Sequence, residues 1–283
     1  CIEMIEILRD IARHPSGRIG FTIVAVFLFA AILAELGLAP YDSLEQDRIA
    51  RLQAPSQAHL FGTDLFGRDV LSRLMIGISQ SFKVSFLSVG AASLAGTVLG
   101  LTAAWFGGLW DGTVMRLMDV LLAFPAILLA LLIITIIGPS GWASILAIAI
   151  VYTPIFTRVV RGPALSLKQR DFFDAARTFG SSRHYIMTRH MALNLVAPLT
   201  VQITLALAWA LVTEAGLSFL GLGTQPPHAS LGLMLADARN LMEMAPWLLL
   251  MPAIALMFAV LGFNLLGDAL RDILDPKTRR ALA

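Results

Sequence analysis

Long apolar runs dominate this chain, and short polar stretches separate them. A helix needs about 20 apolar residues to cross the roughly 30 Å hydrocarbon core of a bilayer. The runs that meet this length cover residues 19–38, 82–106, 117–137, 142–160, 197–220 and 247–266. The pattern therefore predicts an all-α polytopic membrane protein with six transmembrane helices.

Composition supports the same class. Of the 283 residues, 57% are hydrophobic and 14% are charged, and the mean hydropathy is +0.78. Soluble domains have about 45–50% apolar and about 25% charged residues. The formal net charge is +2 and no basic face exists outside the loops, so nucleic-acid binding is not expected. The one cysteine, Cys1, excludes an internal disulfide and a cysteine metal cage.

The placement of charge predicts which ends of the helices face the cytoplasm. The loop 161–196 has a large basic excess, whereas the loop 40–80 carries four Arg and five acidic residues. Basic loops stay on the cytoplasmic side. We therefore expect 161–196 inside, 40–80 outside and both termini inside, with residues 1–18 forming a cytoplasmic interfacial helix and 19–283 forming the transmembrane domain. The basic residues of the inner loop are Arg161, Lys168, Arg170, Arg177, Arg183 and Arg189.

The inner loop has the pattern of two short helices. The first, over about 167–179, places Phe172, Phe173 and Ala176 at helical spacing. Gly180 allows the positive φ that ends a helix, and a second helix follows it. Such apolar faces outside the membrane bury against a soluble cytoplasmic partner, or the hairpin lies on its own bundle or on the lipid surface.

Several features inside the predicted helices have packing consequences. Gly96 and Gly100, four residues apart, favour close approach of another helix. Pro125 predicts a kink within the third apolar run. Residues 107–116 are expected to form a short inside turn.

The outer loop contains a turn-rich segment. His59, Asp64 and Asp69 lie there among glycines, and the aspartates suit turns and helix caps. A metal site is the less favoured interpretation. The apolar spacing over residues 70–78 predicts a helix along the outer surface.

Catalytic motifs are absent from the sequence. It has three lysines, none of which follows a glycine, and no HExxH or Gly-x-Ser-x-Gly. A Walker A phosphate loop is therefore missing, and we expect no enzyme activity. Glu214, inside an apolar run, is a functional candidate. It lines a translocation path or pairs with a partner subunit, or it is a snorkelling or interhelical hydrogen-bonding carboxylate, and the sequence favours none of these.

Three stretches carry a resemblance to a known family. Asp174-Ala175-Ala176, followed by Gly180, resembles the EAA loop of importer-type ATP-binding-cassette permeases. The run RGPALSLKQRDFFDAARTFG, residues 161–180, is similar to the peptide and nickel branch, as are GTDLFGRD (62–69) and EAGLSFLGLGTQPP (214–227). Asp174 replaces the usual Glu, and Leu193 replaces the usual Pro.

The resemblance implies a type I importer transmembrane fold in a bacterial inner membrane. It implies a permease subunit for di- or oligopeptides that pairs with a homologous permease as a heterodimer. Two ATP-binding subunits, which hold ATP and Mg, would lie on the cytoplasmic side, and a solute-binding protein would dock outside; this chain itself would bind no cofactor. The implied coupling residues are Phe172, Phe173, Asp174, Ala175, Ala176 and Gly180. Alternatives are a nickel or metallophore permease and an ion-coupled secondary transporter, although the inverted repeats of the latter are not evident.

Overall fold

The computed structural model describes residues 9–170, 173, 180, 182 and 185–274. Five helices in this part are long and apolar enough to cross a membrane, and a bent pair raises the number to six. The described residues contain no β-strand. The predicted all-α membrane fold is therefore confirmed. The long helices are α2 (Pro15–Glu35), α3 (Val70–Phe106), α6 (Gly141–Leu167), α9 (Val196–Phe219) and α11 (Trp247–Leu274), and a π-helical turn (Ile186–Met191) and a 3₁₀ turn (Ala192–Leu195) lead into α9.

Helix α3 is longer than predicted. It runs without a break for 37 residues, or about 55 Å at 1.5 Å per residue. The expected separate surface helix over 70–78 is wrong, because these residues form the first turns of α3. Val70, Leu74 and Ile78 are buried in the main core beneath α10 (Leu231–Ala238). No proline interrupts this segment, so the helix continues from the membrane into the outer loop.

The third apolar run forms two helices. Helix α4 (Gly108–Ala123) and helix α5 (Ala126–Ile137) are bent by 96° relative to each other, so the expected kink at Pro125 is a break. Phe124 is extended, with φ −89° and ψ 139°, as a residue before proline tends to be. The predicted inside turn over 107–116 is also wrong, because α4 begins at Gly108 directly after the turn residue Gly107.

Two glycines determine how closely α3 packs on α6. A Cβ added to Gly96 would lie 2.4 Å from the Cβ of Phe156, and one added to Gly100 would lie 2.6 Å from the carbonyl oxygen of Thr157. Backbones approach this closely only where the side chain is absent. The close approach predicted from the glycine spacing is confirmed, and the neighbouring helix is α6.

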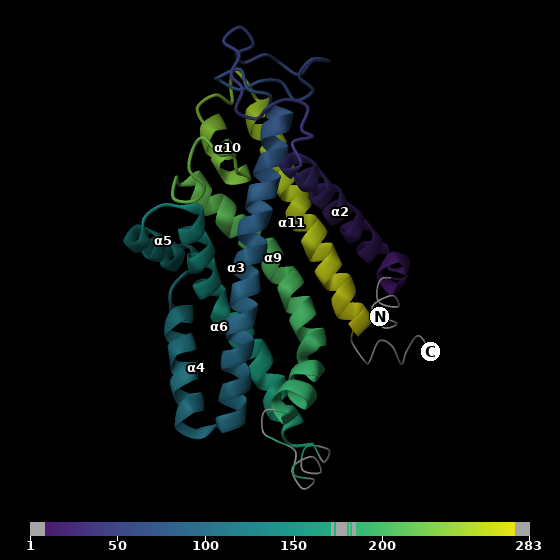
Figure 1. The fold of residues 1–283 in the computed structure, drawn as a ribbon, viewed down its shortest axis with the longest axis vertical. Helices are drawn as coiled ribbons and strands as arrows, with labels where there is room; N and C mark the ends of the chain where they lie inside the picture. The colour runs from purple at the N-terminus through teal and green to yellow at the C-terminus, as the bar shows by residue number, and fades with distance from the viewer. Residues whose placement is uncertain (1–8, 171–172, 174–179, 181, 183–184, 275–283) are drawn as a thin grey trace.

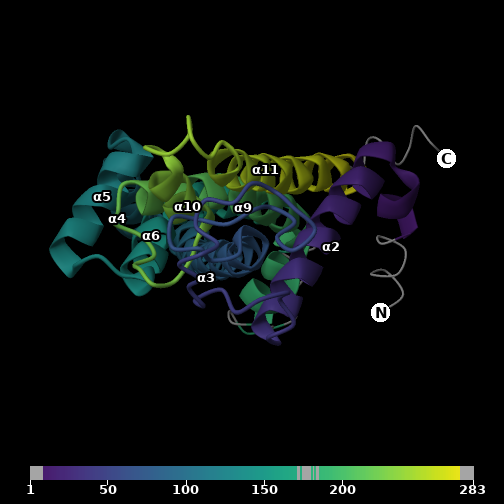
Figure 2. The same cartoon turned by 90° about the horizontal axis from the view of Figure 1, so that it is seen from above.

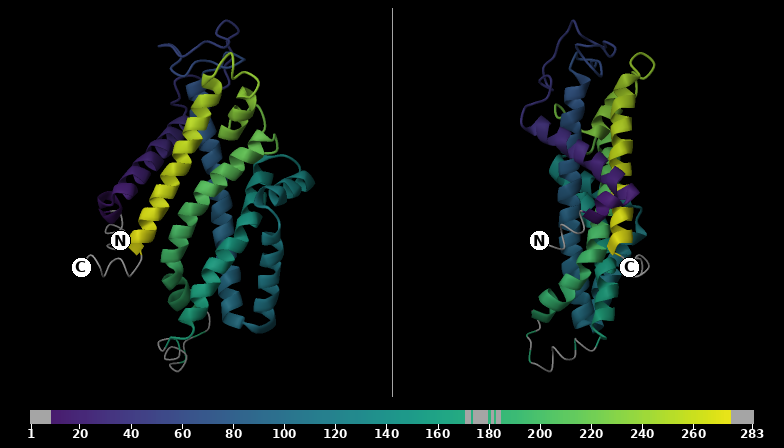
Figure 3. Two further views of the ribbon diagram at one scale, coloured as in Figure 1. Left: turned by 180° about the vertical axis from the view of Figure 1, so that it is seen from behind. Right: turned by 90° about the vertical axis from the view of Figure 1, so that its right-hand side faces the viewer.

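The remaining helices surround this pair. Helix α11 packs against both α2 and α9, as the view from behind shows (Figure 3). Seen along the long axis, α2 lies on one flank, and α4 and α5 lie on the other (Figure 2). The chain between α2 and α3 lies with α10 at one end of the molecule, and α3 and α6 finish at the opposite end (Figure 1). The predicted interfacial helix over 1–18 lies partly outside the described residues, and α2 already begins within it.

The tight α3–α6 contact predicts that alanine has different effects on stability at two glycines of α3. Gly96→Ala should destabilise the protein by about 1–3 kcal/mol, the usual range for overpacking. Gly90→Ala, on the same helix, should be neutral or slightly stabilising, because a Cβ there meets no atom within 4 Å. Thermal unfolding in detergent measures both. Equal midpoints for the two variants would contradict the described packing.

Candidate functional site

The inner end of the molecule brings together part of the predicted coupling loop. Phe172, Asp174, Ala175 and Ala176 lie outside the described residues. Phe173 is fully buried, and its ring centroid lies 5.9 Å from that of Trp105 at the end of α3. Phe173 therefore packs on the chain's own bundle, and its role in coupling stays a prediction.

The Phe173 contact is part of a second apolar core at this end. Its buried members come from α3, α6 and the turns that precede α9, and include Leu101, Val160, Leu167, Ile186, Met191 and Leu195. Residues on either side of the inner loop thus pack together on the ends of the long helices. The base of the loop is anchored to the bundle.

Gly180 has the backbone conformation that the sequence predicted. Its φ is +74°, a region that favours glycine. The residue is exposed, and a Cβ there would meet no atom within 4 Å. A substitution at Gly180 would therefore act through backbone conformation and not through a clash.

Lys168 ties the start of the inner loop to α3. Its Nζ donates hydrogen bonds to the carbonyl oxygens of Ala104 at 3.0 Å and Trp105 at 2.8 Å. The last carbonyl groups of a helix lack partners within the helix, and a lysine there is also favoured by the helix dipole. Lys168 thus caps α3. From the sequence, Lys168 was recognisable only as one of the basic residues of the inner loop, and its capping role was not predicted.

Two ion pairs join α6 to α4. Arg161 holds Asp111 through Nε and Nη2, both at 2.5 Å, and Arg158 contacts Asp119. The Arg161 pair is partly buried and bidentate, which fixes the geometry more strongly than a single contact. The Arg158 pair is exposed, and such pairs contribute little to stability. Neither pair was predicted from the sequence.

Glu214 lies in the protein interior between three helices. It is 1% exposed, and its Oε1 accepts a hydrogen bond from Ser218 Oγ at 2.7 Å. The buried hydroxyls of Ser81, on α3, and Ser230, the residue that caps α10, also face this carboxyl group. Its other oxygen, Oε2, has no hydrogen bond of normal geometry to any described residue.

This environment separates the alternatives for Glu214. Snorkelling is wrong, because the side chain does not reach the surface. The structure favours an interhelical hydrogen-bonding carboxylate that joins α9, α3 and α10. The close packing extends to the backbone, since a Cβ on Gly232 of α10 would lie 2.1 Å from the carbonyl oxygen of Ala215 on α9. A role in the translocation path stays a prediction.

The aspartates of the outer segment close a turn (Asp64) and cap a helix (Asp69), as the sequence predicted. Asp69 caps α3 by accepting from the Ser72 N–H at 2.8 Å, and its other oxygen bonds His59 Nδ1 at 3.0 Å. Asp64 accepts from the backbone N–H groups of Phe66 and Arg68. Among the described residues, no group of three possible metal ligands occurs.

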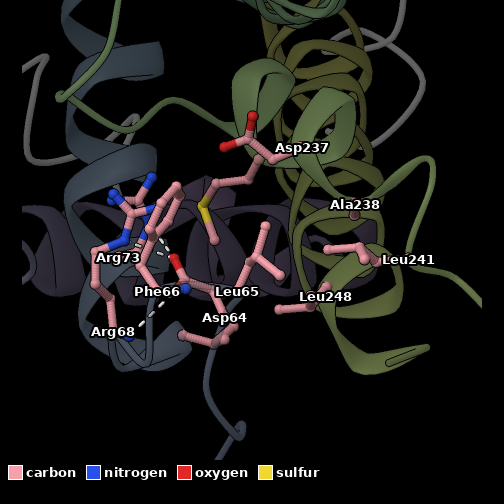
Figure 4. Close-up of a pocket in the computed structure, with 11 residues that line it drawn as sticks. Asp64, Leu65, Phe66, Arg68, Arg73, Asp237, Ala238, Leu241 and Leu248 are labelled. Carbon is pink, nitrogen blue, oxygen red and sulfur yellow. Dashed lines mark hydrogen bonds and ion pairs between the residues drawn. The ribbon is translucent and has the colours of Figure 1, made fainter. Parts of the chain in front are cut away.

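A pocket of about 230 Å³ lies between this outer segment and α10 (Figure 4). Its charged residues are Asp64, Arg68, Arg73 and Asp237. Partial desolvation raises the pKa of the Asp237 carboxyl, an effect that Arg73 and Arg68 oppose, although the residue as a whole is exposed. Asp237 was not among the functional residues expected from the sequence.

Most of the chain matches known protein families. Residues 96–280 match the family described as the binding-protein-dependent transport system inner membrane component. Residues 4–55 match the N-terminal TM domain of oligopeptide transport permease C. The similarity thus extends further toward the N-terminus than the three motif regions.

Relatives of this chain are named for peptide transport. A dipeptide transport system permease protein, DppC, of Alkalihalophilus pseudofirmus is 42% identical, with 97% of this chain and 90% of the relative covered. A probable D,D-dipeptide transport system permease protein, DdpC, of Escherichia coli is 39% identical, with 90% and 86% covered. A glutathione transport system permease protein, GsiD, of Pectobacterium atrosepticum is 41% identical, with 90% and 87% covered.

Solved structures share the fold at low sequence identity. An inward-facing MetNI methionine ABC transporter has a TM-score of 0.58 and 17% identity, with 71% of this chain and 96% of that chain covered. An amino acid ABC transporter has a TM-score of 0.53 and 17% identity, with 73% and 93% covered. These matches confirm the predicted type I importer fold.

The surroundings of Glu214 predict how two substitutions at this position change the stability of the protein. Glu214→Gln should stay folded and at least as stable as the parent, because it keeps an acceptor for Ser218 and removes a buried charge. Glu214→Leu should destabilise the protein by about 1–3 kcal/mol, because polar groups around it lose a partner. Unfolding midpoints measure both. A Leu variant as stable as the Gln variant would contradict the interhelical role.

Proposed function

This chain belongs to the family of binding-protein-dependent transport system inner membrane components, and on that premise we propose that it is the permease subunit of an ATP-driven importer of di- or oligopeptides. The observation that carries the proposal is similarity over nearly the full chain to permeases named for dipeptide transport. The chain is a transport subunit and not an enzyme, so ATP hydrolysis belongs to other subunits of the system.

The relatives also bear on the alternatives. Those described above are named for dipeptides, D,D-dipeptides and glutathione, which favours a peptide over nickel or a metallophore. An ion-coupled secondary transporter is not favoured, because the family works with a binding protein.

The assembly that we propose has four kinds of member. This chain pairs with a homologous permease, two ATP-binding subunits dock on the cytoplasmic side with ATP and Mg, and a solute-binding protein docks outside. Exposed apolar side chains, such as Leu94, Trp142 and Trp209, supply the surface that lipid or the second permease would cover. No cofactor is needed on this chain itself.

The chain is a multi-pass inner membrane protein, and we propose that both termini are cytoplasmic. The basic excess of the 161–196 loop supports a cytoplasmic position for it. The predicted outer loop lies with α10 at the other end of the long axis (Figure 1). This separation fits a protein that meets ATPases at one end and a binding protein at the other.

The contacts at the inner end suggest how coupling would occur. Lys168 and Phe173 connect the loop to α3, and Arg161 connects α6 to α4. A displacement of the loop by the ATP-binding subunits would therefore be passed to α3 and α6. Both helices continue toward the outer end, where α3 begins at its Asp69 cap.

Reconstitution tests the proposed function. The chain is co-purified with its permease, ATPase and binding-protein partners and placed in proteoliposomes. We expect uptake of a labelled dipeptide that requires ATP and the binding protein and is insensitive to dissipation of ion gradients. Uptake driven by an ion gradient without ATP, or uptake of nickel in place of dipeptide, would overturn the proposal.

The coupling role of the inner loop has its own prediction at Gly180. Gly180→Val should cost roughly 1–2 kcal/mol of loop stability, because a side chain is disfavoured at positive φ. It should reduce both co-purification of the ATPases and dipeptide uptake, while permease pairing persists. Gly180→Asn is the matched control, since Asn adopts this conformation more readily. If the Val variant retained its ATPases and took up dipeptide at the parental rate, Gly180 would have no role in coupling.

A further inference from the structure

The outer pocket combines opposite charges with an apolar wall. Figure 4 shows Arg68 and Arg73 together with Asp64 on one side and Asp237 on the other. The pocket is completed by apolar side chains that include Met234, Leu241 and Leu248. These residues come from the outer segment that leads into α3 and the first turn of α3 itself, from α10 and the turn after it, and from the start of α11. The pocket therefore depends on parts of the chain that are distant in sequence.

Arg68 and Arg73 form a positively charged wall of the pocket. Arg68 is 8% exposed and Arg73 is 4% exposed. Asp64 Oδ2 accepts from Arg68 Nε at 2.6 Å and lies 3.6 Å from Arg73 Nε, and Arg73 Nη1 donates to the carbonyl oxygen of Ser43. One carboxylate therefore faces two guanidinium groups, which leaves an excess positive charge on this wall.

The guanidinium groups also have unused donors. Each arginine carries five N–H donors in a planar fork, and the described bonds occupy only some of them. Arginine binds carboxylates through two parallel hydrogen bonds. A ligand carboxylate is the group that best matches both the charge and the geometry of this wall.

Asp237 supplies the opposite charge. It makes no hydrogen bond and no ion pair within 4.0 Å in the described part of the chain, although the charges of Arg68 and Arg73 act on it across the pocket. A carboxylate in this position matches an ammonium group. The four charged residues of the pocket sum to zero, so a purely anionic or purely cationic ligand would leave one side without a counter-charge.

We propose that this outer pocket binds the zwitterion of a free amino acid or dipeptide. The carboxylate contacts Arg68 and Arg73, the ammonium group contacts Asp237, and the side chain lies against Met234, Leu241 and Leu248. The volume of about 230 Å³ is below the roughly 300–1,000 Å³ of pockets for drug-sized ligands, which favours a ligand of this size over a longer peptide. The inference goes beyond the proposed function, because it assigns a solute site to the permease itself, and it rests on that function only for the solute class.

Binding to the purified complex tests the proposal. Permeases and ATPases in nanodiscs, without the binding protein, are titrated with dileucine by calorimetry. We expect saturable binding, and at least tenfold weaker binding of N-acetyl-dileucine and of dileucine amide, because each lacks one of the two charges. The absence of saturable dileucine binding, or equal affinity for the capped forms, would overturn the site.

Variants locate the binding in this pocket. Asp237→Asn should weaken dileucine binding at least tenfold and leave the affinity for N-acetyl-dileucine unchanged, and Asp237→Glu should restore part of the loss. Glu243→Gln is the control, because Glu243 is an exposed acid on the segment after α10 and does not line the pocket. Unchanged dileucine affinity in Asp237→Asn would contradict the inference.

Transport by the same complexes in proteoliposomes distinguishes a failure of the pocket inference from a failure of the proposed function. If ATP-driven dipeptide uptake proceeds while dileucine fails to bind the nanodisc complex, the pocket inference alone is wrong. If ATP-driven uptake fails and dileucine still binds, the proposed function is wrong and the site stands.

Discussion

The close packing of α3 on α6 organises the whole helix bundle. At Gly96 and Gly100 the two helices approach so closely that an added methyl group would overlap Phe156 or the backbone of Thr157. At these two positions α3 contributes no side chain to the contact, so a small displacement of either helix opens a void or creates a clash. The pair is therefore best regarded as one body, to which the other helices are attached.

Helix α3 extends this body from one end of the molecule to the other. Its outer end carries Asp69, which caps it, and Arg73, which lines the outer pocket. Between its two ends, Ser81 of α3 lies beside the buried Glu214. At its inner end, Trp105 contacts Phe173 and Lys168 of the inner loop. The inner and outer ends are thus connected by one helix without a proline. A bundle of short, kinked helices would not connect them in this way.

The sequence predicted those features that depend on local pattern. The length of the apolar runs predicted the membrane helices, and the glycine at position 180 predicted the positive φ there. The aspartates flanked by glycines predicted the turn at Asp64 and the helix cap at Asp69. The bend at Pro125 was underestimated, because proline chemistry predicts a disruption but tertiary packing decides its angle. Lys168, Asp237 and the Arg161–Asp111 pair could not be predicted, because their partners are distant in the chain and one sequence does not show which distant residues meet. The sidedness inferred from charge stays a prediction.

We infer that α3 and α6 move as one body during transport. Spin labels at Leu94 on α3 and Ile150 on α6, both exposed, measure this directly by electron double resonance in the assembled complex, with Cys1 replaced by serine. We expect the distance between the labels to differ by less than about 2 Å between the resting and the ATP-trapped states, because about 2 Å is the scale that separates local adjustment from rearrangement. A larger change would show that the two helices slide or separate, and that the pair does not move as one body.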